Sequence, residues 1–288
     1  MRMQTAREMF DRNLTGAQLS QYAQQLLRRI QLSEARIRHL LPQLTIRSFD
    51  EGALIWAKGR SVQAWNCIMT GYVAAAVPVQ RSGRIPLHVY GPDAWFGEQA
   101  LLDGQPSDLD YICLTPVEVI GMSQLCLQEA VRAEPDFSGA LLQLMSLRAR
   151  QHTGMLAMMR TACSSLRLVI GLAQFAEAQS LQAAAPAPNH DVVDIPIGQD
   201  QIASVCGVSR TLFSAGLQHL VRAGWVKVRY GALELQFAQA WRSFAHSQRE
   251  SLSINSRPSM AELLSGLARA RASNGINKTC ALSPAAPP

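Results

Sequence analysis

Residues 198–236 read GQDQIASVCGVSRTLFSAGLQHLVRAGWVKVRYGALELQ, and this stretch decides the fold of the C-terminal part of the chain. Ile202 and Val205 have the spacing of a short helix, and Gly207 supplies the left-handed residue that ends one. Ser209 is a good N-terminal cap for a second helix. The WVKVRYGALEL segment then predicts two strands with a tight turn. This order predicts a winged helix-turn-helix.

Polar and basic side chains favour DNA as the partner of this module. In the second helix Phe213, Leu217 and Leu220 share one face, and the capped N-terminus offers free backbone N–H groups to a phosphate. A net charge of +6 suits a polyanionic partner. The alternative is a ligand-binding or scaffolding protein whose winged helix contacts protein rather than DNA. The candidate DNA-binding residues are Ser209, Arg210, Thr211, Ser214, Gln218, Lys227 and Arg229.

Two further kinds of structure are expected upstream. Glycines punctuate short apolar runs over residues 45–122, a pattern typical of an antiparallel barrel or jelly roll. Residues 136–179 form a helical stretch after Pro135, with two apolar stripes, one of which is interrupted at Arg148. A helix with two apolar sides can pack on its own barrel and on a second subunit, so we expect a homodimer.

The expected fold class is therefore α+β, with five parts. They are an N-terminal helical extension (1–32), a β-barrel sensor domain (33–135), a long dimerisation helix and hinge (136–180), a winged helix-turn-helix DNA-binding domain (181–245) and a mostly disordered tail (246–288). The tail holds one short helix candidate, opened by a capping box at Ser259 and Glu262.

Three motifs resemble those of the cyclic-AMP receptor protein and FNR family of bacterial transcription regulators, the Crp/Fnr family. GPDAWFGEQALLDGQPS (91–107) is similar to the phosphate-binding cassette of that family. RLVIGLAQFA (167–176) is similar to the segment after its dimer helix, and IASVCGVSRTLFSAGLQHL (202–220) to its DNA reader. The resemblance implies a jelly-roll sensor domain like those that bind cyclic nucleotides, a homodimer, and a palindromic double-stranded DNA target. RNA polymerase is a further partner that it suggests.

The resemblance places the DNA-reading residues at Arg210, Thr211 and Ala215. Arg210 retains the family's arginine, which can bind O6 and N7 of guanine. Thr211 replaces the usual acidic partner, and Ala215 replaces a second arginine. We therefore do not expect the common half-site of the family.

The effector pocket departs further from the family pattern. In members that bind cyclic nucleotides, a Gly-Glu pair holds the ribose and an Arg-Ser or Arg-Thr pair holds the phosphate. Ser107 and Asp108 stand at the second pair, and loss of the arginine should cost about 1.5–3 kcal/mol of binding. Cyclic AMP is therefore disfavoured and the effector is unknown. The candidate pocket comprises Gly97 and Glu98, Ser107 and Asp108, and on the long helix His152 and Thr153.

Other cofactors and classes receive less support from the sequence. The barrel either takes a different effector or takes none. No cysteine precedes Cys67, which disfavours an FNR-type iron–sulfur cluster, and haem would have to use His88 or Cys113. The scattered histidines and the lack of a P-loop or nucleophile elbow argue against an enzyme. Without a signal peptide or a membrane-spanning run, we expect a cytoplasmic protein. In the expected mechanism, occupancy of the barrel changes the packing of the helix pair at 136–166 and re-aims the two recognition helices.

Overall fold

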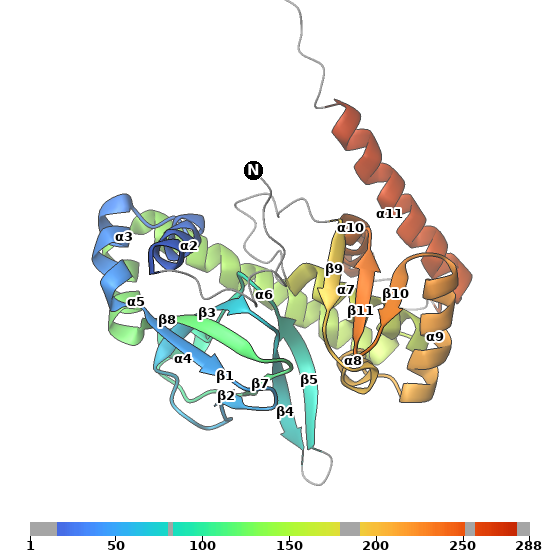
Figure 1. The fold of residues 1–288 in the computed structure, drawn as a ribbon, viewed down its shortest axis with the longest axis horizontal. Helices are drawn as coiled ribbons and strands as arrows, with labels where there is room; N and C mark the ends of the chain where they lie inside the picture. Colours follow the sequence, from blue (N-terminus) through green and yellow to red (C-terminus); the bar gives the residue numbers. More distant parts are fainter. Residues whose placement is uncertain (1–15, 80–82, 179–190, 251–256, 281–288) are drawn as a thin grey trace, which may run out of the picture. The chain divides into compact units, whose positions relative to one another are not determined.

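The computed structural model describes residues 16–79, 83–178, 191–250 and 257–280, which form two compact units (Figure 1). The first unit holds the described residues up to Ala149, together with Ala178. The second holds Arg150 to Glu177 and the described residues from 191 onwards. Helix α6 (Pro135–Thr161) contributes to both units. Within the described ranges, no helix is long and apolar enough to cross a membrane.

The first unit is built on two four-stranded antiparallel sheets rather than on a closed barrel. One sheet has the order β1 (Thr45–Phe49), β8 (Val117–Ser123), β3 (Ala64–Thr70) and β6 (Trp95–Phe96). The other has the order β2 (Leu54–Trp56), β7 (Asp110–Cys113), β4 (Val73–Val79) and β5 (Gly83–Tyr90). The expectation of a β-barrel is thus corrected to a β-sandwich. Strands as short as β2 and β6 leave too few hydrogen bonds to join the two sheets into one closed ladder.

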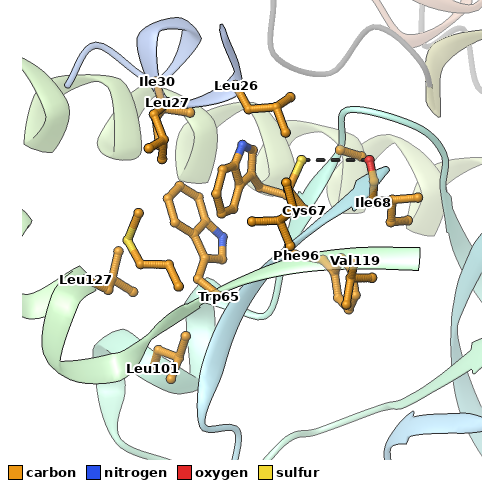
Figure 2. Close-up of a cluster of buried hydrophobic side chains, with 14 of the residues drawn as sticks. Leu26, Leu27, Ile30, Trp65, Cys67, Ile68, Phe96, Leu101, Val119 and Leu127 are labelled. Atoms are coloured by element: carbon orange, nitrogen blue, oxygen red, sulfur yellow. Dashed lines mark hydrogen bonds between the residues drawn. The ribbon is translucent and has the colours of Figure 1, made fainter. Parts of the chain in front are cut away.

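The N-terminal helices complete the core of the sandwich unit. The helices of this unit are α2 (Gly16–Arg29), α3 (Glu34–Leu40), the 3₁₀ helix η1 (Leu41–Gln43), α4 (Glu98–Asp103), α5 (Gln124–Ala133) and the first part of α6. Figure 2 shows Leu26, Leu27 and Ile30 in the same buried cluster as Trp65 and Leu127. The segment 16–32, expected as an extension, therefore contributes Ala23, Leu26, Leu27, Ile30 and Leu32 to the hydrophobic core, whereas residues 1–15 lie outside the described part.

The second unit contains the elements expected over 198–236 and several that were not expected. Besides the second part of α6, the elements of this unit are α7 (Ser164–Ala178, whose last residue belongs to the first unit), β9 (Val192–Ile195), α8 (Gln199–Val205), α9 (Arg210–Arg222), β10 (Val226–Arg229), β11 (Ala232–Gln236), α10 (Ala238–Glu250) and α11 (Met260–Cys280). The strands form an antiparallel sheet in the order β10-β11-β9.

Two features of this unit differ from the expectations. The helical stretch expected over 136–179 is two helices, because α6 ends at Thr161 and α7 begins at Ser164. The tail was expected to be mostly disordered apart from one short helix opened at Ser259 and Glu262. That helix is α11, which is longer than expected at 21 residues and buries Leu263 and Leu267. Residues 251–256 and 281–288 of that tail lie outside the described part.

Candidate functional site

Helix α4 starts at a position that requires glycine. Gly97 precedes α4 with a φ of +93°, in the left-handed region that side chains avoid. A Cβ on Gly97 would also stand 2.6 Å from the ring of Trp56, so no other residue fits without displacing the indole. Gly97 thereby aims Glu98, the first residue of α4, into the protein interior.

Both carboxylate oxygens of Glu98 are engaged by side chains of this chain. The indole Nε1 of Trp65 donates to Oε2 at 3.0 Å, and the guanidinium of Arg148 on α6 forms an ion pair with Oε1. A second nitrogen of Arg148 donates to the carbonyl oxygen of Trp95, and the guanidinium lies over the ring of Tyr90, 5.3 Å from its centroid. Glu98 is 1% exposed and Arg148 is 9% exposed, so the ion pair is shielded from water.

Aromatic rings from both sheets fill the interior next to this pair. The ring of Trp56 on β2 lies 5.2 Å from Phe96 on β6, and Tyr111 on β7 stacks on Phe96 at 5.3 Å. Tyr90 on β5 contacts the same Phe96 ring at 5.6 Å. Burial raises the pKa of Tyr111 well above its ordinary value, so this hydroxyl keeps its proton at neutral pH.

The residues expected to face a phosphate are used differently. Ser107 is buried, and its hydroxyl donates to the carbonyl oxygen of Leu109 at 2.7 Å. Its backbone exchanges hydrogen bonds with the turn after β2, to Gly59 at 2.8 Å and to Arg60 at 2.9 Å. Asp108 is exposed. Ser107 therefore belongs to the internal hydrogen bonding of the sandwich.

Basic residues elsewhere in the unit neutralise the acidic side chains of this region. Asp110 accepts hydrogen bonds from the backbone N–H of Lys58 and from Nε of Arg84, both at 2.7 Å. Burial alone would raise the pKa of Asp110, but these hydrogen bonds and the charge of Arg84 outweigh it and lower that pKa. Asp93, just before β6, pairs with Arg29 of α2 at 2.5 Å.

The remaining effector and cofactor candidates do not converge on a metal site. His152 and Thr153 are exposed on the part of α6 that belongs to the second unit. His88 is half-buried, with its ring 4.6 Å from the ring of Tyr90. Burial raises the pKa of the Cys113 thiol to about 11. Among the residues that the structure describes, no group of three or more His, Cys, Asp and Glu side chains could hold a metal ion.

The second candidate site is the exposed N-terminus of α9. Ser209 caps it from an extended conformation, and its hydroxyl accepts a hydrogen bond from the N–H of Leu212 at 3.4 Å. Arg210 pairs with Asp200 of α8 at 2.7 Å, and the two side chains are 73% and 65% exposed. Such an exposed pair contributes about 0–1 kcal/mol, so Arg210 can leave it for another partner at little cost. The other expected residues on this helix, Thr211, Ser214 and Gln218, are exposed as well.

The β10–β11 hairpin carries the remaining two DNA-binding candidates. Lys227 and Arg229 are exposed on β10. Arg229 pairs with Glu234 across the hairpin and stands 4.0 Å from Asp194 of β9. Tyr230 follows at the turn and is fully exposed. The seven candidate residues thus all lie on α9, its cap and this hairpin.

Sequence reasoning missed Arg148 and Trp65, the two partners of Glu98. Arg148 had left a signal, because it interrupts an apolar stripe on α6. A charge at a position that the helical period buries indicates an acidic partner inside the protein. Trp65 left no such signal, because a tryptophan in an apolar strand is ordinary core.

Comparisons with known proteins agree with this architecture. Residues 46–134 match the family model described as a cyclic nucleotide-binding domain. The chain is 25% identical over 190 residues to the CRP-like cAMP-activated global transcriptional regulator of Mycobacterium tuberculosis, which covers 66% of this chain and 83% of the relative. It is 24% identical to the global nitrogen regulator of Synechocystis, with 66% and 83% covered.

Two solved structures share the fold at lower identity. FixK2 from Bradyrhizobium japonicum has a TM-score of 0.57 at 15% identity, covering 75% of this chain and 99% of that one. The c-di-GMP responsive global regulator CLP of Xanthomonas campestris has a TM-score of 0.51 at 17% identity, covering 71% and 99%. At these identities the likeness concerns the fold alone.

Proposed function

Because this chain belongs to the Crp/Fnr family of transcription regulators, we propose that it is a homodimeric, sequence-specific DNA-binding regulator that acts in the cytoplasm. One observation carries the proposal: α9 presents a capped N-terminus with an exposed arginine, and the hairpin that follows α9 exposes Lys227 and Arg229. In this reading α8 and α9 form a helix-turn-helix, with α9 in the major groove and the β10–β11 hairpin as the wing.

Helix α6 supports the proposed homodimer. Leu142, Ala149 and Leu156 recur every seven residues along it and are exposed. Leu142 is 69% exposed and Leu156 is 64% exposed, which is costly for leucines on a free surface. Apolar residues seven positions apart form a stripe along one side of a helix, and two helices can pack side by side along such stripes. Two copies joined in this way would read two half-sites of a palindrome, in contact with or in competition with RNA polymerase.

We propose that the sandwich does not respond to cyclic AMP. The carboxylate expected for the ribose is engaged by Trp65 and Arg148, and a serine with an internal hydrogen bond stands where the phosphate would need an arginine. The relatives do not fix an alternative effector. One is named for activation by cAMP and another for a response to c-di-GMP.

Cyclic AMP, cyclic GMP and cyclic di-GMP at millimolar concentration should leave the melting temperature unchanged. A ligand at a hundred times its Kd would stabilise the folded state by about 2.7 kcal/mol, a shift of about 5–10 °C for a chain of this size. The mycobacterial relative, named as cAMP-activated, is the positive control. A rise with cyclic AMP in this protein would contradict the proposed loss of the phosphate site.

Replacing Arg210 by alanine should weaken binding to the preferred operator by about 5- to 150-fold, because a bidentate arginine–guanine contact contributes about 1–3 kcal/mol. The operator is first selected from random palindromes with the wild-type protein, and affinities are then measured by fluorescence anisotropy. If Arg210 reads a guanine, the Arg210→Ala variant should discriminate less between the four bases at one position of each half-site. Arg222→Ala, at the other end of α9, should leave base discrimination intact. Unchanged operator affinity in Arg210→Ala would favour the alternative in which α9 contacts protein.

A further inference from the structure

The chain continues beyond the hairpin with two further helices. Helix α10 follows β11 directly, and α11 packs along α10 and contacts α9. All of the contacts below lie within the second unit, which includes residues 150–177 of α6 and α7. Together these contacts link α9, α10 and α11 to one another and to α7.

The entry into α10 is held in an unusual backbone conformation. Phe237 has a φ of +60°, in the left-handed region that bulky residues rarely adopt. Its carbonyl oxygen accepts from the N–H groups of Ala240 and Trp241, so this residue sets the direction of α10. The guanidinium of Arg271 on α11 covers the Phe237 ring at 3.5 Å from its centroid, and Trp225 contacts its edge. Strained residues persist where the surrounding contacts over-determine them.

The other end of α10 is fastened to α7 and to α6. Arg249 forms a two-pronged ion pair with Glu177 on α7, with one nitrogen 2.9 Å from Oε2. Burial would lower the pKa of Arg249, but the hydrogen bond to Glu177 outweighs this and raises that pKa, so the guanidinium keeps its charge. Arg242, about two turns earlier on α10, donates to the carbonyl oxygen of Ala176 at 2.8 Å, near the end of α7.

The stem of Arg249 also explains the glycine inside α6. A Cβ at Gly154 would lie 3.1 Å from both Cγ and Cδ of Arg249, so the bare backbone of α6 lets α10 approach. Glycine inside a helix lowers its stability, so its presence at this contact has a packing reason.

At the start of α11 the tail reaches α9. Leu263 and Leu267 of α11 are buried, and the methyl group of Met260 stands 3.4 Å from the position of a Cβ on Gly216 of α9. The residue facing Met260 therefore lies on the proposed recognition helix. The tail thus contacts α9 through Met260, and it contacts the α6–α7 pair through Arg242 and Arg249.

We propose that α10 and residues 257–274 are a brace that fixes the angle between α9 and the second part of α6, with Arg249 as its positioning residue. This inference deepens the proposed function and rests on it, because the angle sets which half-site spacing a dimer can read. Without the brace, α9 could still bind one half-site, but two copies would accept several spacings.

The test compares Arg249→Ala with Arg257→Ala, an exposed arginine outside these contacts. The first readout needs no DNA: amide hydrogen exchange in the last turn of α7 and in α10 should be at least ten times faster in Arg249→Ala only. The second readout is the preferred length of the spacer between the two half-sites of the operator. Wild type should prefer one spacer by at least tenfold, and Arg249→Ala should lose that preference while binding an isolated half-site normally. The charge swap Arg249→Glu with Glu177→Arg should restore both.

Unchanged exchange in Arg249→Ala would overturn the brace. Faster exchange with an unchanged spacing preference would overturn the positioning role, because the contact would then only stabilise the unit. If the wild-type protein selects no operator at all, the proposed function fails instead. In that case the exchange measurements still test the contact between the tail and α7. Exchange should be faster in Arg249→Ala and should return to the wild-type rate in the charge-swapped double variant.

Discussion

Replacing Arg148 by alanine should lower the free energy of unfolding of the sandwich by about 3–5 kcal/mol, the cost of leaving a buried charge without its partner. Glu98 would keep only the hydrogen bond from Trp65, and the carbonyl oxygen of Trp95 would lose a donor. Urea denaturation of the variant and of the wild-type protein measures this loss.

Two further variants separate the ion pair from simple loss of packing. Arg150→Ala, exposed on the same helix, should change stability by less than about 0.5 kcal/mol. The double variant Glu98→Gln with Arg148→Met should recover most of the loss, because replacing both partners removes the uncompensated charge. An equal loss in the double variant would mean that packing of the arginine stem, and not the charge of Glu98, dominates.

Replacing Gly171 by alanine should destabilise the second unit by about 1–3 kcal/mol and weaken DNA binding with it. The added Cβ would stand 2.5 Å from Cα of Cys206, which is backbone and cannot rotate away. Helix α8 would have to move from α7, and the turn that leads to the cap of α9 would move with it. Thermal melting and operator affinity measure the two effects.

Gly139→Ala is the matched control for this steric effect. Gly139 is also helical, on α6, and nothing lies within 4 Å of an added Cβ. The same substitution should therefore stabilise the chain by about 0.5–1 kcal/mol, the usual gain of alanine over glycine in a helix. If both variants were stabilised alike, the close approach of α7 to α8 would not be what holds this unit together.

The C-terminal module was predictable because its signals are local. Ser209 caps α9 as its position predicted, and Phe213, Leu217 and Leu220 are buried on the face that their spacing indicated. The two strands expected over WVKVRYGALEL are β10 and β11. Each of these features depends on residues a few positions apart, and such patterns survive in a single sequence.

The rest depended on contacts between distant residues. Whether short strands close into a barrel or stay in two sheets depends on pairings that no local pattern encodes. Arg148, the partner of Glu98, is 50 residues away on α6. The apolar face of α11 is buried because it packs on α10. Of the expected effector residues, Glu98 is buried as part of an ion pair, Ser107 bonds internally and Asp108 is exposed. The departure from the family cassette indicated that cyclic AMP is not the expected ligand. It did not indicate which internal contacts Glu98 and Ser107 make instead.

The hydrogen bond from Trp65 to Glu98 gives the protein its own optical probe. The indole of Trp65 lies 4.3 Å from that of Trp95 and donates to the buried carboxylate of Glu98. Any compound that draws Glu98 away should therefore change the emission of this pair. The two tryptophans that lie outside the sandwich, Trp225 and Trp241, are close together in the second unit. With both changed to phenylalanine, fluorescence would report the sandwich alone, and compound libraries could be screened without labels.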